Sequence, residues 1–331
     1  MAEPTLDVVA IGNAIVDVIS QEDDAFIASH ALTKGGMQLI DTDQAELLYA
    51  DMGAAREVSG GSAANTLAGM AALGSACGFI GQVHDDQLGA IFAHDIRALG
   101  IRFATAAATD GPPTARCLIM VTPDAQRTMN TFLGASQYLP AAALDPELIR
   151  SAGILYLEGY LWDPEEPRAA MRSAIAIAKD AGRKVAFTLS DTFVIDRHRG
   201  DFLKLIDEGA IDILFSNEGE ICFLAEVDDF DAAVAKIAAK VPVLVSTRSE
   251  KGAVAVVVGT WYEAPAAPVD NIVDTTGAGD LFAAGFLAGH IKGRSVETCL
   301  SMGAVAAAEV ISHYGARPEA DLKALIAPLI A

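Results

Sequence analysis

Short apolar runs recur along the chain and predict the strands of one sheet. Most of these runs are nearly continuous and rich in β-branched residues, which is typical of strands covered on both faces of a parallel sheet. Between them lie segments with apolar residues at helical spacing, such as 165–182 and 228–240. The alternation predicts a doubly wound α/β fold, with a mostly parallel sheet flanked by helices. The predicted strands are 6–12, 77–83, 153–159, 184–190, 212–217, 241–247 and 252–258.

Two other segments alternate between apolar and polar residues, as antiparallel strands with one solvated face do. They cover 14–20 and 114–132, and the second contains the turn sequence "TPDAQ" between two strands. We interpret them as a small separate β-sheet that acts as a lid. The α/β body would then consist of 1–13, 41–102 and 136–331, and the lid of 14–40 and 103–135. The final part of the chain, 275–331, predicts helices with a turn at "GARP", 315–318.

Composition and charge narrow the class of protein. The chain has 331 residues, 52% of them hydrophobic, which is enough for a globular protein with a large core. The formal net charge is −21, and the basic residues form no cluster that could neutralise phosphates. We therefore expect no nucleic acid and no anionic membrane as partner. The four cysteines are far apart and lack the spacing of a zinc site, so we expect reduced thiols.

No segment is expected to target the chain to a membrane or to export it. The first basic residue is Lys34, so the N-terminus lacks the basic region of a signal peptide. The longest uncharged run, 58–83, is rich in Gly, Ser, Asn and Thr, and fits a turn, a helix and a strand better than a membrane span. These features lead us to expect a cytoplasmic protein.

The stretch "DTTGAGD", 274–280, is the first candidate site. Its glycines leave backbone N–H groups unobstructed at the start of a predicted helix, where amide donors and the helix macrodipole favour an anion. Asp280 in the first turn has two interpretations. It either complements the helix dipole or acts as a general base beside an anion site. The stretch is not a P-loop, because no GxxxxGK[ST] sequence occurs in the chain.

Three further motifs follow predicted strands or open helices. "GNAIVD" places Asn13 and Asp17 after the first strand, where ligands of open α/β sheets bind. "SGGSAAN" fits a tight turn before a helix, and its Asn65 could bond a polar ligand. "SNEGE" carries Asn217 and Glu220, which could hold a hydrated Mg²⁺ or simply cap a helix.

Taken together, these motifs resemble those of the ribokinase-like (PfkB) carbohydrate and nucleoside kinases. The resemblance extends over nearly the whole chain, from "VVAIGNAIVD" through "GGSAAN" and "SNEGE" to "DTTGAGD" and "GARP". The combination of "GNAIVD", "GGSAAN" and "AQRTMNTFLGAS" is most similar to the adenosine kinase branch. The implied fold is a ribokinase-like α/β body with a small β lid.

The resemblance implies roles for the acceptor side of the site. Asp280 would be the catalytic base that takes a proton from the acceptor hydroxyl. The amides of the three residues before it would bind the transferred phosphoryl group. Arg127 would reach the phosphates from the lid. The residues so implied are Gly277, Ala278, Gly279 and Asp280 for catalysis, and Asn13, Asp17, Gly61, Asn65 and Arg127 for substrate binding.

The resemblance also implies a nucleotide side. Asn217 and Glu220 would organise Mg²⁺ through water, and Thr247 and Gly252 would lie in the loop under ATP. Ser249 in that loop departs from many relatives, which carry glycine there. The residues that resemble a monovalent-cation site, which K⁺ would fill, are Asp274, Thr276 and Gly315.

The implied activity is ATP-dependent phosphorylation of the 5′-hydroxyl of a purine nucleoside, with adenosine converted to AMP in purine salvage. A ribokinase- or fructokinase-type sugar kinase of the same fold is the alternative, because a free furanose offers similar hydroxyls. A nucleoside-binding sensor without catalysis is a third hypothesis, against which the intact Asp280 argues. Both a monomer and a homodimer are compatible with the resemblance.

Overall fold

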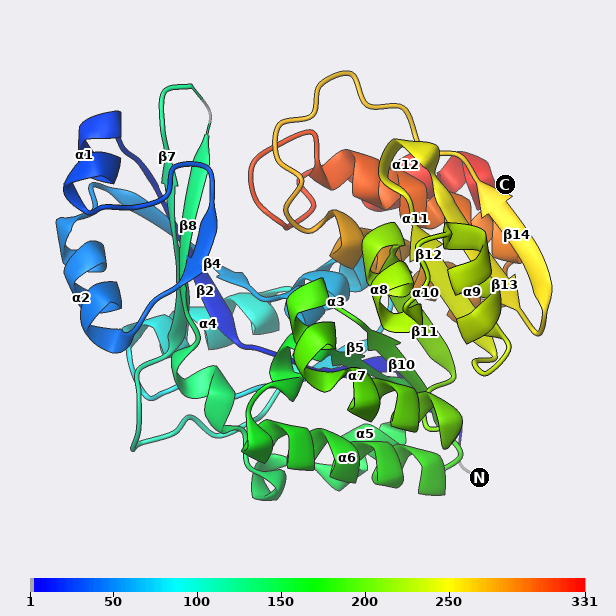
Figure 1. The fold of residues 1–331 in the computed structure, drawn as a ribbon. Helices are drawn as coiled ribbons and strands as arrows, with labels where there is room; N and C mark the ends of the chain where they lie inside the picture. The colour runs from blue at the N-terminus through cyan, green and yellow to red at the C-terminus, as the bar shows by residue number, and fades with distance from the viewer. Residues whose placement is uncertain (1–2, 125, 331) are drawn as a thin grey trace.

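The computed structural model describes residues 3–124 and 126–330, and its main element is a nine-stranded sheet (Figure 1). Seven strands run parallel, and β13 and β14 complete one edge in antiparallel pairing. The predicted mostly parallel α/β fold is confirmed. In sheet order the strands are β14(Thr260–Ala264), β13(Ala253–Val257), β12(Val243–Thr247), β11(Ile213–Asn217), β10(Lys184–Thr188), β9(Ala152–Glu158), β1(Leu6–Ile11), β5(Cys77–Ile80) and β6(Arg102–Phe103).

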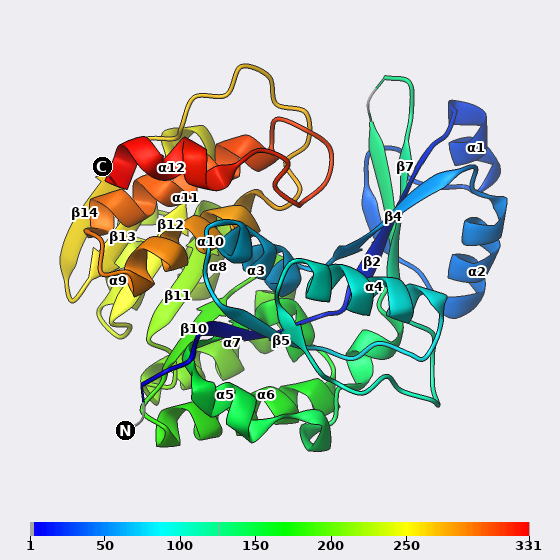
Figure 2. The ribbon, with the colours of Figure 1, turned by 180° about the vertical axis from the view of Figure 1, so that it is seen from behind.

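Helices cover both faces of this sheet, because its central strands carry apolar side chains on both sides. In β1, Val8 and Ala10 belong to one core, whereas Val9 and Ile11 belong to the other. Figures 1 and 2 show the two helix layers. The first layer contains α3(Ser62–Ala72), α4(Gln87–Ala98), α10(Ala278–Ile291), α11(Val296–Val310) and α12(Leu322–Ile330). The second contains α5(Pro146–Ser151), α6(Glu165–Asp180), α7(Thr192–Asp207), α8(Glu218–Ala225) and α9(Phe230–Ala238).

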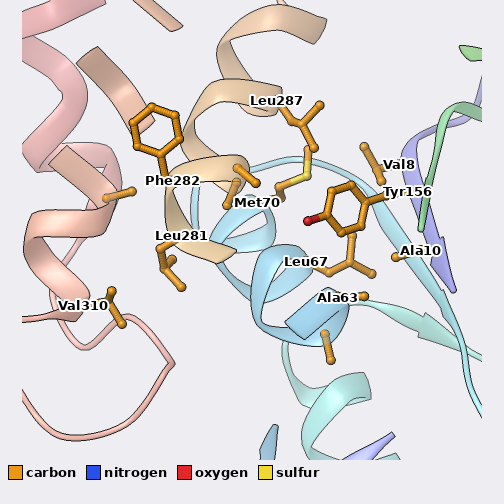
Figure 3. Packing of buried hydrophobic residues seen from close by; sticks show 14 of the residues in the cluster. Val8, Ala10, Ala63, Leu67, Met70, Tyr156, Leu281, Phe282, Leu287 and Val310 are labelled. Carbon is orange, nitrogen blue, oxygen red and sulfur yellow. The ribbon is translucent and has the colours of Figure 1, made fainter. Parts of the chain in front are cut away.

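A close contact between α3 and α10 positions the site. A Cβ on Gly69 of α3 would lie 2.6 Å from Leu281 Cδ1 and 2.7 Å from Ala284 Cβ of α10, so the helices approach closely only because glycine stands there. Figure 3 shows Leu67 and Met70 of α3 in the same core as Leu281 of α10. The packing brings the first turns of the two helices together, and both first turns carry predicted site residues.

The smaller sheet has five strands and stands beside the body (Figures 1 and 2). Alternation in β2 and β8 gives it two different faces, since Val16 and Val18 are buried while Ile15 and Asp17 border a cleft. Its strands in order are β3(Met37–Leu39), β8(Arg127–Phe132), β7(Ala115–Val121), β2(Ile15–Gln21) and β4(Ala55–Gly60), and its helices are α1(Asp24–Ser29) and α2(Thr42–Asp51). Four 3₁₀ turns complete the structure, η1(Gly134–Tyr138), η2(Ala141–Ala143), η3(Gly159–Trp162) and η4(Ser249–Lys251).

The predicted small sheet is present, with one correction to its extent. The sequence-based division assigned 41–102 to the body, but β4 pairs with β2 and α2 packs on β7 and β8. The reason is that "AREVSG" lacks a regular apolar alternation, and it joins the small sheet only through its partner strand. Strands β3, β6 and β14 were not predicted either. Ala125 in the predicted turn and Ala331 at the predicted helical end lie outside the described residues.

Within 3–124 and 126–330, no helix is long and apolar enough to cross a membrane.

Candidate active site

A cleft of about 570 Å³ lies between the small sheet and the edge of the large sheet where its parallel strands end. Ligands of open α/β sheets bind at this edge. Most of the predicted site residues line the cleft, although they come from distant parts of the chain. They are Asn13, Asp17, Gly61, Asn65, Asn217, Glu220, Thr247, Thr276, Gly277, Ala278, Gly279 and Asp280.

The "GAGD" stretch forms the beginning of α10. Gly277 is the N-cap in a left-handed conformation with φ 78°, and a Cβ there would lie 2.7 Å from Ala316 Cβ. The left-handed conformation and the close approach of Ala316 both explain why a glycine occupies this position. The Ala278 N–H donates to the Thr275 carbonyl oxygen over a long 3.3 Å, so this amide is only weakly engaged within the turn. A helix N-terminus in this arrangement can bind an anion next to Asp280.

Asp280 is held by two side chains from the first turn of α3. Ser62 Oγ donates to Asp280 Oδ1 at 2.6 Å, and Asn65 Nδ2 donates to Asp280 Oδ2 at 3.1 Å. Burial raises the pKa of Asp280, and the hydrogen bonds from Ser62 and Asn65 and the charge of Arg317 lower it in part. A carboxylate that is desolvated yet held as an acceptor is suited to proton abstraction.

The double-glycine turn packs directly on the first strand's loop. Gly61 has φ 96°, and a Cβ on it would come 2.2 Å from the Asn13 carbonyl oxygen. A Cβ on Gly60 would come 2.6 Å from Asp17 Oδ2. Asn65 Oδ1 is buried and has no hydrogen-bond partner among the described residues, so a ligand hydroxyl can satisfy it.

Asp17 faces the same space from the lid. Burial raises the pKa of Asp17 to about 6, while the charges of Arg317 and Arg127 lower it and Asp280 raises it further. The ionised form is therefore present at neutral pH and can accept hydrogen bonds from hydroxyl groups. Asp17, Asn65 and Asp280 together form a polar end of the cleft.

Glu158 completes this polar end and was not among the predicted residues. It is fully buried at the end of β9, and its Oε1 accepts from Asn13 N at 2.7 Å and from Asn13 Nδ2 at 2.6 Å. Its Oε2 accepts from Ala63 N at 2.7 Å. Burial raises the pKa of Glu158 to about 7. The carboxylate thus fixes Asn13, whose Oδ1 also accepts from Ser136 Oγ at 2.8 Å.

Arg127 of the lid binds the residues that precede α10. Its Nη1 forms an ion pair with Asp274 Oδ2 and donates to Thr276 Oγ1 at 3.0 Å. Asp274 also accepts from Thr276 N, from Thr276 Oγ1 and from Gly315 N, at 2.7–3.0 Å. The Asp274 carboxylate therefore already has a cationic partner and three other donors. As arranged, Asp274, Thr276 and Gly315 do not fit a monovalent cation, and we derive no step through K⁺.

Asn217 and Glu220 form a capping box at the start of α8. Asn217 Oδ1 accepts from Glu220 N at 2.8 Å, and the two Glu220 oxygens accept from Asn217 N and Nδ2 at 3.0 and 2.7 Å. Burial raises the pKa of Glu220 to about 7, and the charge of nearby Asp191 adds to it. The carboxylates of Glu220 and Asp191 both line the cleft. They offer hard oxygen donors, and no basic side chain among the described residues forms an ion pair with them, which fits a hydrated Mg²⁺.

The loop after β12 carries the predicted residues Thr247 and Gly252. Thr247 ends the strand and borders the cleft, whereas Gly252 lies outside the lining. Gly252 has φ 88°, and a Cβ there would come 2.1 Å from the Ala264 carbonyl oxygen. Ser249 adopts φ 50°, a left-handed conformation that glycine adopts more readily. Among the described residues, no group of three or more His, Cys, Asp or Glu side chains could hold a metal by itself.

Ser62, Glu158 and Arg317 touch or hold this site and were missed by the sequence reasoning. Ser62 lies inside the quoted "SGGSAAN" motif, but a serine after a glycine turn has an ordinary role at a helix start. Glu158 gave the clearest signal, because it is a single carboxylate at the end of a buried apolar strand. Arg317 lies in "GARP", which we interpreted as a turn and as part of the family resemblance, with a role assigned only to its Gly315.

This geometry defines a phosphotransferase whose acceptor is a hydroxyl group, with an α/β body and a β-sheet lid. Residues 7–322 match the model of the pfkB family carbohydrate kinases, and the chain belongs to that family. It is a sugar or nucleoside kinase.

Two solved structures and one characterised relative are similar over most of the chain. A probable sugar kinase from Rhizobium etli is 46% identical, with 98% of this chain and 99% of that chain covered and a TM-score of 0.91. An adenosine kinase from Sinorhizobium meliloti is also 46% identical, with the same coverage and a TM-score of 0.90. An ATP-dependent ribose-1-phosphate kinase from Halopiger xanaduensis is 29% identical over 80% of this chain and 85% of its own length.

Proposed function

We propose that the protein transfers the γ-phosphoryl group of ATP to the 5′-hydroxyl of a purine nucleoside, with adenosine as the preferred acceptor and AMP as the product. This activity would place it in purine salvage. The similarity to an adenosine kinase at 46% identity supports the proposal. The observation that carries it is the apolar part of the cleft lining.

The lid presents apolar side chains to the cleft instead of to a protein core. Met37 and Leu39 in β3 are 48% and 56% exposed, and both line the cleft together with Met129 of β8. The body contributes the rings of Tyr160 and Phe193 to the same cleft, with their centroids 5.9 Å apart. Exposed apolar surface of this kind marks a ligand site. A planar base would cover it, whereas a free sugar would leave it in water.

The polar end of the cleft supports the transfer step. The acceptor hydroxyl gives its proton to Asp280 as its oxygen forms a bond to the γ-phosphorus, and the bond from that phosphorus to the bridging oxygen of ADP breaks. The α10 N-terminus then stabilises charge on the transferred group, because its amides and macrodipole point at it. Asp17 and Asn65 Oδ1 orient the acceptor through its other hydroxyls. Such alignment supplies much of the rate in phosphoryl transfer.

Glu220 and Asp191 are the residues that would hold Mg²⁺, through water molecules that the ion keeps. When bound, Mg²⁺ neutralises charge on the β- and γ-phosphates. The chain itself contributes few basic groups at the cleft, so the nucleotide end of the site needs this charge.

A coupled ADP-release assay tests the proposal with adenosine, inosine, guanosine, ribose and fructose as acceptors. We expect adenosine to give the highest kcat/KM. A sugar that exceeds every nucleoside by a wide margin would refute the nucleoside assignment. No turnover with any acceptor, although ATP and adenosine bind, would instead favour a sensor.

The Leu39→Ala variant tests the base contact separately from the chemistry. Removing a half-exposed leucine side chain from a ligand contact costs about 1–1.5 kcal/mol of binding, or roughly a 5- to 12-fold rise in KM for adenosine. The KM for ribose should not change. Leu47→Ala is the matched control, because Leu47 is 62% exposed on α2 and does not line the cleft. An equal effect on adenosine and ribose would contradict the base contact.

A sugar kinase is the second candidate, and the arrangement of Glu158 supports it. Its buried carboxylate joins Asn13 to the first turn of α3, which gives the polar end a shape that a furanose ring alone could fill. The similarity to a probable sugar kinase points the same way. The acceptor panel distinguishes the two candidates directly.

A further inference from the structure

Arg317 joins the C-terminal loop to the turn that carries the acceptor-binding residues. Its Nε donates to the Ser59 carbonyl oxygen at 2.9 Å, and its Nη2 donates to Ser59 Oγ at 3.2 Å. Its Nη1 donates to the Ala64 carbonyl oxygen at 2.8 Å. The planar guanidinium therefore spans the double-glycine turn, with two hydrogen bonds to the residue before Gly60 and one to a residue after Gly61.

The side chains of the turn itself restrain it little, so it is held by contacts from other segments. Gly60 pairs with Ile15 of β2 and Ala63 N donates to Glu158 Oε2, and Arg317 supplies the contact from the C-terminal loop. Gly60 and Gly61 have no side chains, and Gly61 is left-handed with φ 96°. The three residues that depend on this turn are Asp17, which packs on Gly60, and Ser62 and Asn65, which hydrogen-bond Asp280. A shift of the turn would move these contacts together.

The same loop touches two other parts of the site. Gly315 N donates to Asp274 Oδ2 at 3.0 Å, and Ala316 packs so closely against the N-cap Gly277 that no Cβ would fit between them. Arg317 thus links the start of α10 to the start of α3. All three of its hydrogen bonds go to neutral oxygens, so its charge acts on the carboxylates of the cleft from a short distance without an ion pair.

We propose that Arg317 is a positioning residue for catalysis, which holds the 59–64 turn so that Ser62 and Asn65 present Asp280 to the acceptor and which keeps a fixed positive charge behind the cleft. It does not touch the acceptor in this role. The inference rests on the proposed phosphotransfer to a hydroxyl, but not on which nucleoside or sugar accepts the phosphoryl group.

The charge and the hydrogen-bond fork can be separated by two substitutions. Arg317→Lys keeps the charge but cannot span Ser59 and Ala64, whereas Arg317→Met loses both. Removing the charge favours the protonated form of Asp280, so the acid limb of kcat/KM should move to higher pH in Arg317→Met by about one pH unit. The charged and titratable groups around Asp280 that remain in both variants are Asp17, Glu158, Tyr156 and Tyr160.

The experiment measures kcat and KM against pH with ATP, Mg²⁺ and adenosine, together with thermal unfolding. We expect both variants to lose at least about 10-fold in kcat, with the acid limb unmoved in Arg317→Lys and raised in Arg317→Met. Arg116→Met is the matched control, because Arg116 is buried in the lid beside Glu46, Tyr49 and Asp86 and not beside the cleft carboxylates. That control should lose stability without a change in the acid limb.

Each other result has a definite meaning. Wild-type kcat and pH profile in both variants would overturn the inference, and so would a failure of both to fold while Arg116→Met folds, since Arg317 would then serve stability alone. If only Arg317→Met fails to fold, Arg317→Lys alone tests the inference: a loss of kcat in this variant supports the positioning role, and wild-type kcat overturns it. A wild-type protein that turns over none of the acceptors would refute the proposed function instead, so the two failures are distinguishable.

Discussion

Asp280→Asn is the substitution that tests the catalytic assignment most directly. The change keeps the size of the side chain and removes its charge and its ability to take a proton. The oxygen of the new amide can still accept from Ser62 Oγ, which lies 2.6 Å from Asp280 Oδ1. The nitrogen of the new amide would face Asn65 Nδ2, which now donates at 3.1 Å, so the Asn65 amide would flip and offer its unpartnered Oδ1. The local geometry therefore survives the change.

The expected magnitude follows from this local geometry. Loss of a positioned general base costs about 10²- to 10⁴-fold in kcat, which corresponds to about 2.7–5.4 kcal/mol in the activation barrier. The KM for the acceptor should rise by no more than a few-fold, because only the flip of Asn65 alters the acceptor contacts. The α10 amides and the remaining alignment should leave a measurable residual rate.

The same substitution should stabilise the fold at neutral and alkaline pH. Burial raises the pKa of Asp280 above its value in the unfolded chain, so the charged form lowers the free energy of unfolding once the pH exceeds that value. A neutral amide at this position removes this cost. The unfolding midpoint should increase at pH 8 and change less at pH 4, because a lower pH favours the protonated carboxyl group in the folded wild type.

The assay is single-turnover and steady-state ADP release, with Asp231→Asn as the control. Asp231 is an exposed aspartate in the first turn of α9, so it represents a residue that only complements a helix dipole. Asp231→Asn should leave kcat unchanged and lower stability by well under about 1 kcal/mol. If Asp280→Asn retains wild-type turnover and behaves like this control, Asp280 is not the base.

Three further predictions concern the neighbouring charges. Asp17→Asn should raise the acceptor KM at least about 10-fold. The substitution should also raise the melting temperature more at pH 8 than at pH 4, because burial raises the pKa of Asp17 to about 6 and the charged form destabilises the fold above that pH. Equal shifts of the melting temperature at both pH values would contradict the raised pKa. Arg127→Met should lower the free energy of unfolding in urea by about 3–5 kcal/mol, since it leaves the buried Asp274 unpaired. Wild-type kcat should be the same in K⁺ and tetramethylammonium salts, and strong activation of the wild type by K⁺ would show that Arg127 does not fill the cation's place.

The sequence was informative wherever a local pattern determines a local structure. Continuous apolar runs predicted the parallel strands, and the glycines of "GGSAAN" and "DTTGAGD" marked turns whose left-handed residues the structure shows at Gly61 and Gly277. Because parallel strands end at one edge, motifs after different strands could be expected to meet. That expectation is realised in the cleft, where twelve of the predicted residues lie.

Contacts between distant segments could not be predicted in the same way. Ser62 bonds Asp280 only because α3 and α10 touch through Gly69, and that closeness depends on packing rather than on any motif. Strand β4 joined the small sheet for a similar reason, since its register is set by β2. The pairing of Arg127 with Asp274 joins residues 147 positions apart, and each residue had another plausible partner.

The charges at the polar end of the cleft also restrict the class of acceptor. Asp17, Glu158 and Asp280 gather there, and each has a pKa that is raised by burial. The guanidinium groups of Arg127 and Arg317 lie nearby, but their hydrogen bonds are directed at the protein itself. Ribose 1-phosphate offers the same free 5-hydroxyl as adenosine, with a phosphate in place of the base. That phosphate would find apolar lid residues instead of cationic donors, and it would add negative charge beside three carboxyl groups. A neutral acceptor with an apolar group at this position matches the cleft on both counts, which supports the proposed nucleoside over ribose 1-phosphate.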